Sequence, residues 1–305
     1  MVVCAPEIGA VSEVVGLERN VKIRSMEQLQ QFRTAHPLQR LATGGAEWQY
    51  IACGQGEQAL LLLPGAMGTA ESSFDRIANT EDRFRVVSPS YPPLGTMAAL
   101  SDGLAAVLDA EGIVRTHVLG HSLGAGIAHA FVRRYPERVD KLVLSGFGLY
   151  NVRNARLARR YVRIFGLLPY GFVSGYYKRR MPKLMAGLDE AERVFMLAYM
   201  DDLLDRQLDK KALMAQFHVL EEMMDHPDIY HLYEPVERPG RVLILQAKDD
   251  TGFQPDEQAA LRATYPGAEV HLFEEGGHLA NLTQRAEADR VIYRFLDAGE
   301  DDTAA

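Results

Sequence analysis

Apolar positions along this chain form short continuous runs that alternate with longer amphipathic stretches. Six runs have the length and the bounding turn residues of buried strands: residues 59–63, 84–87, 116–119, 142–144, 242–245 and 270–273. Helical spacing follows most of them, at residues 97–111, 124–135, 256–264 and 284–296. Repeated strand–helix units predict an α/β protein, with a mainly parallel, doubly wound sheet covered by helices on both faces.

One interval interrupts this alternation. Residues 148–239 carry several amphipathic helical stretches and no strand signal, so we expect a helical cap inserted over the carboxyl edge of the sheet. The core would comprise residues 38–147 and 240–298, and its first strand-like pieces lie at residues 38–43 and 47–53. An N-terminal extension, residues 1–37, would hold a short helix that starts after Ser25. The acidic tail, residues 299–305, is predicted to be disordered.

Composition narrows the class of protein. The chain has 305 residues, 47% of them hydrophobic, and a net charge of -8, which argues against a nucleic-acid-binding protein. Its two cysteines, Cys4 and Cys53, cannot build a disulfide framework, and its first residues lack the features of a secretory signal. We therefore expect a cytoplasmic protein. No apolar run approaches 18 residues, so no membrane span is predicted.

The most specific motif is Gly120-His121-Ser122-Leu123-Gly124, a G-x-S-x-G pentapeptide between a strand-like run and a helix-like run. A chain that turns from strand to helix within one residue forces that residue into a strained conformation, and the flanking glycines leave room for it. Ser122 would be exposed at this apex, close to a helix N-terminus that stabilises negative charge.

A serine hydroxyl needs a base to accept its proton and a third group to orient that base. His278 follows the predicted strand that ends at Phe273, and Asp250 follows the one that ends at Leu245. Since the carboxyl ends of parallel strands share one edge of a sheet, both side chains should lie near Ser122. Asp249 is the competing acid.

The order Ser, Asp, His and the elbow context resemble the α/β-hydrolase family from about Leu38 to Leu296. This resemblance implies that Ser122 is the nucleophile, that His278 acts as general base and then acid, and that Asp250 fixes the imidazole tautomer. Pro255 stands five residues after Asp250, one more than is usual in the family.

Two backbone N–H groups should stabilise the oxyanion of such a reaction. Leu123 supplies one, and the loop after residues 59–63 supplies the other, with Ala66 as the first candidate and Met67 as the next. The loop reads Pro64-Gly65-Ala66-Met67-Gly68 and lacks the histidine that family members commonly carry there. Met67 and His121 are also candidate substrate contacts.

These residues predict a serine hydrolase that cleaves a carboxylic ester or related acyl bond of a small molecule through an acyl-enzyme. No cofactor or metal is expected. A carbon–carbon bond hydrolase, a lactonase or a perhydrolase would carry the same triad. A non-catalytic interaction protein is a further alternative, because the layout of the N-terminal segment, the Tyr91-Pro92 loop and residues 263–266 looks like maspardin-type members. A protein partner or an oligomer is compatible with each alternative.

The start of the cap is strongly basic. Nine Lys or Arg residues and no acidic residue lie between Tyr150 and Leu188. We expect these side chains to form a solvated face, although such a face could also attract an anionic substrate, partner or bilayer surface. The other histidines are interpreted as structural: His117, His121 and His129 near the elbow, and His226 with His231, whose spacing makes a poor metal site.

Overall fold

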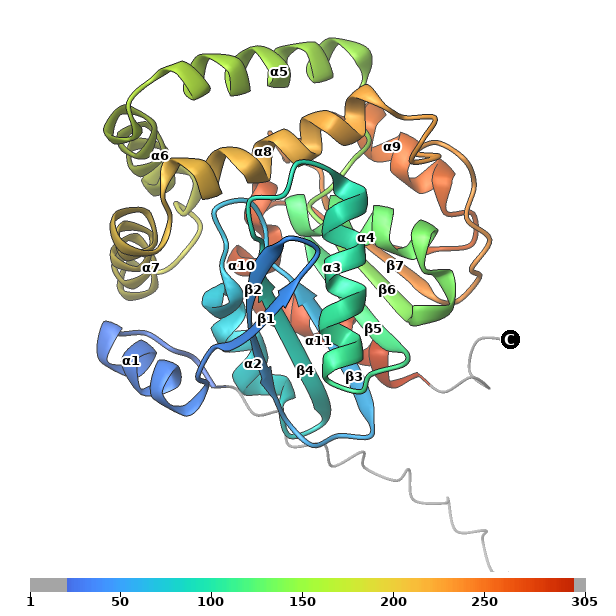
Figure 1. The fold of residues 1–305 in the computed structure, drawn as a ribbon, viewed down its shortest axis with the longest axis horizontal. Coiled ribbons are helices and arrows are strands. Elements are labelled where there is room, and N and C mark those ends of the chain that lie inside the picture. The colour runs from blue at the N-terminus through green and yellow to red at the C-terminus, as the bar shows by residue number, and fades with distance from the viewer. Residues whose placement is uncertain (1–20, 299–305) are drawn as a thin grey trace, which may run out of the picture.

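The computed structural model describes residues 21–298 (Figure 1). Within them, eight strands form one sheet in the order β1-β2-β4-β3-β5-β6-β7-β8. The first two join antiparallel, β2 also lies antiparallel to β4, and the remaining neighbours are parallel. The strands are β1 Gln39–Thr43, β2 Ala46–Cys53, β3 Gln58–Leu63, β4 Phe84–Ser90, β5 Thr116–His121, β6 Val139–Ser145, β7 Val242–Ala247 and β8 Glu269–Phe273. The predicted mainly parallel sheet is confirmed.

Helices precede, connect and follow these strands. Outside the segment between β6 and β7, the described residues contain α1 Met26–Ala35, α2 Phe74–Thr80, α3 Met97–Ala110, α4 Leu123–Arg134, α9 Pro255–Thr264, α10 Ala280–Thr283 and α11 Arg285–Asp297. The helix expected after Ser25 is α1, and the Ser25 hydroxyl accepts a hydrogen bond from the N–H of Gln28 at 3.1 Å. The predicted tail, residues 299–305, and residues 1–20 lie outside the described residues.

Strand β3 shows how one sheet holds two cores. Its alternate side chains point to opposite faces, as the period of a strand requires. Leu61 and Leu63 pack in the cluster that contains α3 and α4, whereas Leu60 and Leu62 pack in the cluster that contains α2 and α11. All four leucines are buried. A continuous apolar run is therefore what a strand covered on both faces needs, and the doubly wound arrangement is confirmed.

Between β6 and β7 the described chain forms helices and no strand. These are α5 Val152–Leu167, α6 Tyr170–Leu184, α7 Glu190–Asp202 and α8 Lys210–Asp225. Figure 1 shows α5 and α8 lying one above the other over one end of the sheet, with α6 and α7 beside them. None of the helices in residues 21–298 combines the length and apolarity needed to cross a bilayer.

Two details differ from the sequence expectation. Strand β4 continues through Pro89 to Ser90, where we expected a loop after residue 87. Pro89 pairs with Tyr50 of β2. On its other side, β4 pairs with β3 only as far as Val87, so the missing N–H of Pro89 removes no hydrogen bond to β3. Helix α2 was not expected either, because seven residues are too few to show a clear helical period.

Gly103 in α3 provides a packing test of the core. A Cβ atom at this position would lie 2.2 Å from Cζ2 of Trp48, which is fully buried. Gly103→Ala should therefore lower the free energy of unfolding by roughly 1–3 kcal/mol through overpacking. Urea denaturation would measure the change.

The matched control is Gly175→Ala in α6, where no atom lies within 4 Å of the added Cβ. Alanine should raise the free energy of unfolding there by about 0.5–1 kcal/mol, because glycine is a poor helix former. Equal effects at the two positions would contradict the packing argument.

Candidate active site

Ser122 lies at the junction of β5 and α4. Its φ of 51° and ψ of -117° place it in a conformation that residues other than glycine rarely adopt. The N–H of Ser122 donates to the carbonyl of Ser145 at 2.9 Å, and its own carbonyl accepts from Ala125 at 3.0 Å. A Cβ at Gly124 would lie 2.0 Å from the carbonyl oxygen of Leu63, so only glycine fits. The strained serine is thus fixed by its neighbours, as an elbow requires.

Three side chains that the sequence places far apart meet here. The Oγ of Ser122 lies 2.9 Å from Nε2 of His278. The other ring nitrogen of His278, Nδ1, lies 3.1 and 3.3 Å from the two carboxylate oxygens of Asp250. His278 belongs to a short 3₁₀ helix, Gly277–Leu279, in the loop after β8. The predicted constellation of Ser122, His278 and Asp250 is therefore brought into continuous hydrogen-bond contact.

The two neighbouring aspartates occupy different positions. Asp250 is 9% exposed and accepts from the N–H of Gly252 at 2.6 Å in addition to contacting His278. Burial works to raise the pKa of Asp250, but these hydrogen bonds outweigh it and hold the pKa below its usual value. Asp249 instead accepts from the backbone N–H groups of Gly276 and Gly277, at 3.2 and 2.9 Å. Asp250 contacts the imidazole, and Asp249 holds the loop that carries it.

The candidate oxyanion donors lie on either side of Ser122. Leu123 is the first residue of α4, so its N–H has no partner within the helix. Ala66 and Leu123 both line the cavity that contains Ser122. The N–H of Met67, the second candidate in that loop, donates to Oε1 of Gln216 at 2.7 Å and is already engaged. The contacts therefore favour Ala66 over Met67.

A cavity of about 470 Å³ lies between the elbow and the cap. Its walls come from α5, α6 and α8 together with the loops after β6 and β7, and their aromatic side chains include Tyr150, Tyr161, Phe165, Tyr177, Phe217 and Phe253. The side chains of Met67 and His121, our candidate substrate contacts, are not among its lining residues. Sequence reasoning missed the aromatic walls because nothing in an amphipathic cap pattern shows which face meets the serine.

The basic cap face has two parts. On α5, the side chains of Arg153, Arg156, Arg160 and Arg163 are exposed, as expected for a solvated face. Arg180 of α6 differs, since it lines the cavity of Ser122 and also a groove that reaches His278. It donates to the hydroxyl of Tyr176 at 2.8 Å. The basic residues therefore reach the cavity as well as the outer face, and within the cavity Arg180 is accompanied by one acidic residue, Glu221 of α8.

Only one group of three potential metal ligands occurs among residues 21–298, and it lies away from Ser122: His36, Cys53 and Glu81. His226 and His231 are not part of such a group, and His231 instead pairs with Glu234 at 2.8 Å. Sequence reasoning missed the group because its members are brought together by three separate elements.

Comparison with known proteins assigns the family. A model of the alpha/beta hydrolase fold matches residues 58–284, which is well over half of the sequence. The chain belongs to this family. A hydrolase from Pseudomonas aeruginosa has a similar structure, with a TM-score of 0.70 at 20% identity, covering 86% of this chain and 99% of that one. A meta-cleavage product hydrolase from Pseudomonas fluorescens gives a TM-score of 0.63, at 20% identity and 85% and 97% coverage.

Sequence relatives carry a more specific name. A 2-hydroxy-6-oxononadienedioate/2-hydroxy-6-oxononatrienedioate hydrolase from Burkholderia vietnamiensis is 27% identical over 262 residues, covering 81% of this chain and 90% of that protein. The protein of the same name from Paraburkholderia phymatum is 29% identical over 283 residues, with 83% and 92% coverage. Together with the family match, these relatives support a hydrolase.

Two histidines near the elbow, His117 and His129, are fully buried, and a third, His121, is half-buried. Burial lowers the pKa of His117 to about 4 and that of His121 and His129 to about 3. All three should therefore be neutral at neutral pH, which agrees with their interpretation as structural residues. His129 uses both ring nitrogens, facing the Tyr265 hydroxyl at 2.7 Å and the Leu232 carbonyl at 3.2 Å.

Because these folded-state pKa values lie below the unfolded value of about 6.5, the unfolded chain binds more protons between pH 6.5 and about 4. Each buried histidine should then cost about 1.4 kcal/mol of stability per pH unit as the pH falls through that window. His129→Gln should show a shallower loss of stability between pH 7 and 5 in urea titrations. His218→Gln, at an exposed histidine, is the control. Identical slopes for His129→Gln and wild type would contradict the burial argument.

Proposed function

We propose that this protein is a serine hydrolase that cleaves a carboxylic ester or related acyl bond through Ser122, His278 and Asp250. The observation that carries the proposal is the unbroken contact from Ser122 Oγ to His278 Nε2 and from His278 Nδ1 to Asp250, beside an aromatic cavity. These contacts suit a base that takes the serine proton while a carboxylate fixes its tautomer.

In the acylation step, Ser122 Oγ forms a bond to the substrate carbonyl carbon and gives its proton to Nε2 of His278. The N–H groups of Leu123 and Ala66 would stabilise the resulting oxyanion. The bond to the leaving alcohol then breaks, and His278 returns the proton to that oxygen. Asp250, held ionised by its hydrogen bonds, stabilises the imidazolium between the two transfers.

Deacylation repeats these steps with water as the nucleophile. His278 accepts a proton from water as the oxygen attacks the acyl carbon, and then returns a proton to Ser122 as the acid leaves. The cavity of about 470 Å³ would hold the acyl group against its aromatic walls. Access for water remains possible because His278 also borders the groove on the other side of Arg180.

Hydrolysis of a carbon–carbon bond is the second candidate, favoured by the names of the sequence relatives. The same serine would attack a ketone, and the leaving carbon would depart as a stabilised enolate that must itself receive a proton. A dienedioate carries two negative charges, and Arg180 places a cation at the cavity mouth. A lactonase or a perhydrolase would use the same acylation chemistry as an esterase, because the same bond forms at Ser122.

Two substrate series would test the function: p-nitrophenyl esters of increasing chain length, and a 2-hydroxy-6-oxo-dienedioate. We expect ester hydrolysis with a burst of one nitrophenol per Ser122, and a turnover that Ser122→Ala lowers by roughly 10³-fold or more because the triad acts as a unit. A fluorophosphonate probe should label wild type and not Ser122→Ala.

The outcomes are distinct. If kcat/KM for the dienedioate exceeds that for every ester, and Arg180→Gln selectively removes that difference, carbon–carbon bond hydrolysis replaces ester hydrolysis as the proposed function. Absence of labelling in a folded wild-type protein would instead favour a non-catalytic interaction protein and overturn the proposal.

The two aspartates give a further test. Asp250→Asn should lower kcat by roughly 10³–10⁴-fold, because an amide facing Nδ1 favours the wrong imidazole tautomer. Asp249→Asn should cost no more than about tenfold, because it weakens two backbone contacts of the loop and leaves the imidazole contact in place. Steady-state kinetics of the two variants, with circular dichroism as a folding control, decide the matter. The reverse order would make Asp249 the triad acid.

A further inference from the structure

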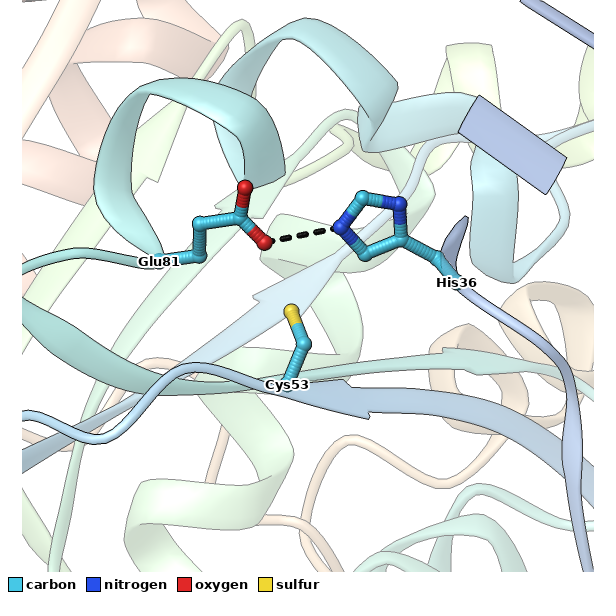
Figure 2. Close-up of side chains that lie close together, drawn as sticks. All are labelled: His36, Cys53 and Glu81. Atoms are coloured by element: carbon cyan, nitrogen blue, oxygen red, sulfur yellow. Dashed lines mark hydrogen bonds and ion pairs between the residues drawn. The ribbon is translucent and has the colours of Figure 1, made fainter. Parts of the chain in front are cut away.

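A second cluster of reactive side chains lies far from Ser122 in the fold. His36 follows α1, Cys53 ends β2, and Glu81 follows α2. Figure 2 shows the three side chains converging from these separate elements. One nitrogen, one sulfur and one carboxylate oxygen lie within 4.8 Å of one another. The mechanism proposed for Ser122 uses none of them.

Both ring nitrogens of His36 face hydrogen-bond acceptors, and a neutral imidazole has too few protons to bond to both. Nδ1 lies 2.9 Å from the carbonyl oxygen of Phe32, which can only accept, so Nδ1 must carry a proton. Nε2 lies 2.7 Å from Oε2 of Glu81, another acceptor when ionised. A neutral imidazole has a single N–H, so a proton or a metal cation must lie between Nε2 and the carboxylate.

A metal cation would also use the third side chain. Zn²⁺ binds His nitrogen, Cys sulfur and carboxylate oxygen at about 2.0–2.3 Å, which sets tetrahedral ligand atoms about 3.3–3.6 Å apart. The Nε2 to Oε2 distance would then have to open by about 0.6 Å. Glu81 allows this, because its side chain is 27% exposed. The bond from Nδ1 to a backbone carbonyl is the usual contact of a metal-bound histidine.

The backbone already fixes the positions of these residues. The His36 ring stacks on Phe32 at 4.1 Å between centroids, and the N–H of His36 donates to the same carbonyl as the ring. Gly54, directly after Cys53, has a φ of +79°, and a Cβ there would lie 2.5 Å from the carbonyl oxygen of Glu81. The backbones beside Cys53 and Glu81 are therefore in close contact, which keeps their side chains near one another.

We propose that His36, Cys53 and Glu81 form a zinc-binding site that joins α1 to the sheet. Cys53 pairs with Val86 near the start of β4, so the site lies at the amino edge of the parallel strands, opposite the edge that carries Ser122. Solvent would complete the coordination, since all three residues are partly exposed. A site in this position stabilises the fold and has no part in the hydrolysis.

Zinc binding should release two protons. Zinc binds cysteine as a thiolate, so Cys53 must lose its thiol proton, and the metal also replaces the proton that lies between Nε2 of His36 and Glu81. Calorimetric titration of chelator-treated full-length protein with Zn²⁺, in buffers of different ionisation enthalpy, would count both zinc ions and protons. We expect one zinc ion bound and two protons released, and a Tm that rises with the zinc concentration.

Variants locate the site. Cys53→Ser, His36→Gln and Glu81→Gln should each weaken zinc binding by roughly 100-fold or more, and Co²⁺ should give a thiolate-to-metal absorption band that Cys53→Ser removes. The controls are Cys4→Ser, which changes the other cysteine, and His231→Gln, which changes a histidine paired with a glutamate without a cysteine nearby. Both should bind zinc as wild type does.

Ser122→Ala should also bind zinc normally, so the fate of this proposal is independent of the hydrolase proposal. Circular dichroism would confirm that each variant is folded, and Glu81→Gln serves as the mildest change if the others are unstable. The proposal is overturned if wild type binds no zinc at micromolar concentration. It is equally overturned if a folded Cys53→Ser variant binds zinc as tightly as wild type does.

Discussion

The close approach of Gly124 to the Leu63 carbonyl is the contact on which the site depends. It brings the first turn of α4 down onto the end of β3, the strand whose following loop carries Ala66. The same turn presents the N–H of Leu123 and holds Ser122 in its strained conformation. One close backbone contact thus sets the distance between Ser122 and both candidate oxyanion donors. Any side chain at position 124 would push these parts apart.

Two neighbouring aspartates in the loop after β7, Asp249 and Asp250, fix the position of His278 in different ways. Asp250 is buried and contacts His278. Asp249 is exposed and accepts hydrogen bonds from the backbone of the two glycines that precede His278. A histidine on a glycine-rich loop would otherwise be free to leave the serine. Asp250 therefore holds the ring directly, and Asp249 holds the backbone that carries it.

The sheet and the meeting of Ser122, His278 and Asp250 could be predicted from the sequence because each depends on local signals. The apolar run of β3 and the pentapeptide around Ser122 are local patterns. Because parallel strands share one carboxyl edge, side chains that follow different strands are expected to meet there. Elements with weak local signals were missed, such as α2 and the extension of β4 through Pro89. The cap cavity and the group of His36, Cys53 and Glu81 depend on packing between distant segments, which no periodicity reveals.

The cap contributes to the site as well as covering it. Gln216 of α8 is 3% exposed, and its side-chain oxygen accepts the N–H of Met67 while its nitrogen lies 3.4 Å from the carbonyl of Gly68. This pair of contacts ties the loop that carries Ala66 to a helix of the insertion. A shift of α8 would therefore move a candidate oxyanion donor along with the cavity wall. Because α8 contacts both the cavity and the loop of Ala66, a substitution in α8 should change the affinity for substrate and the rate of the chemical step together.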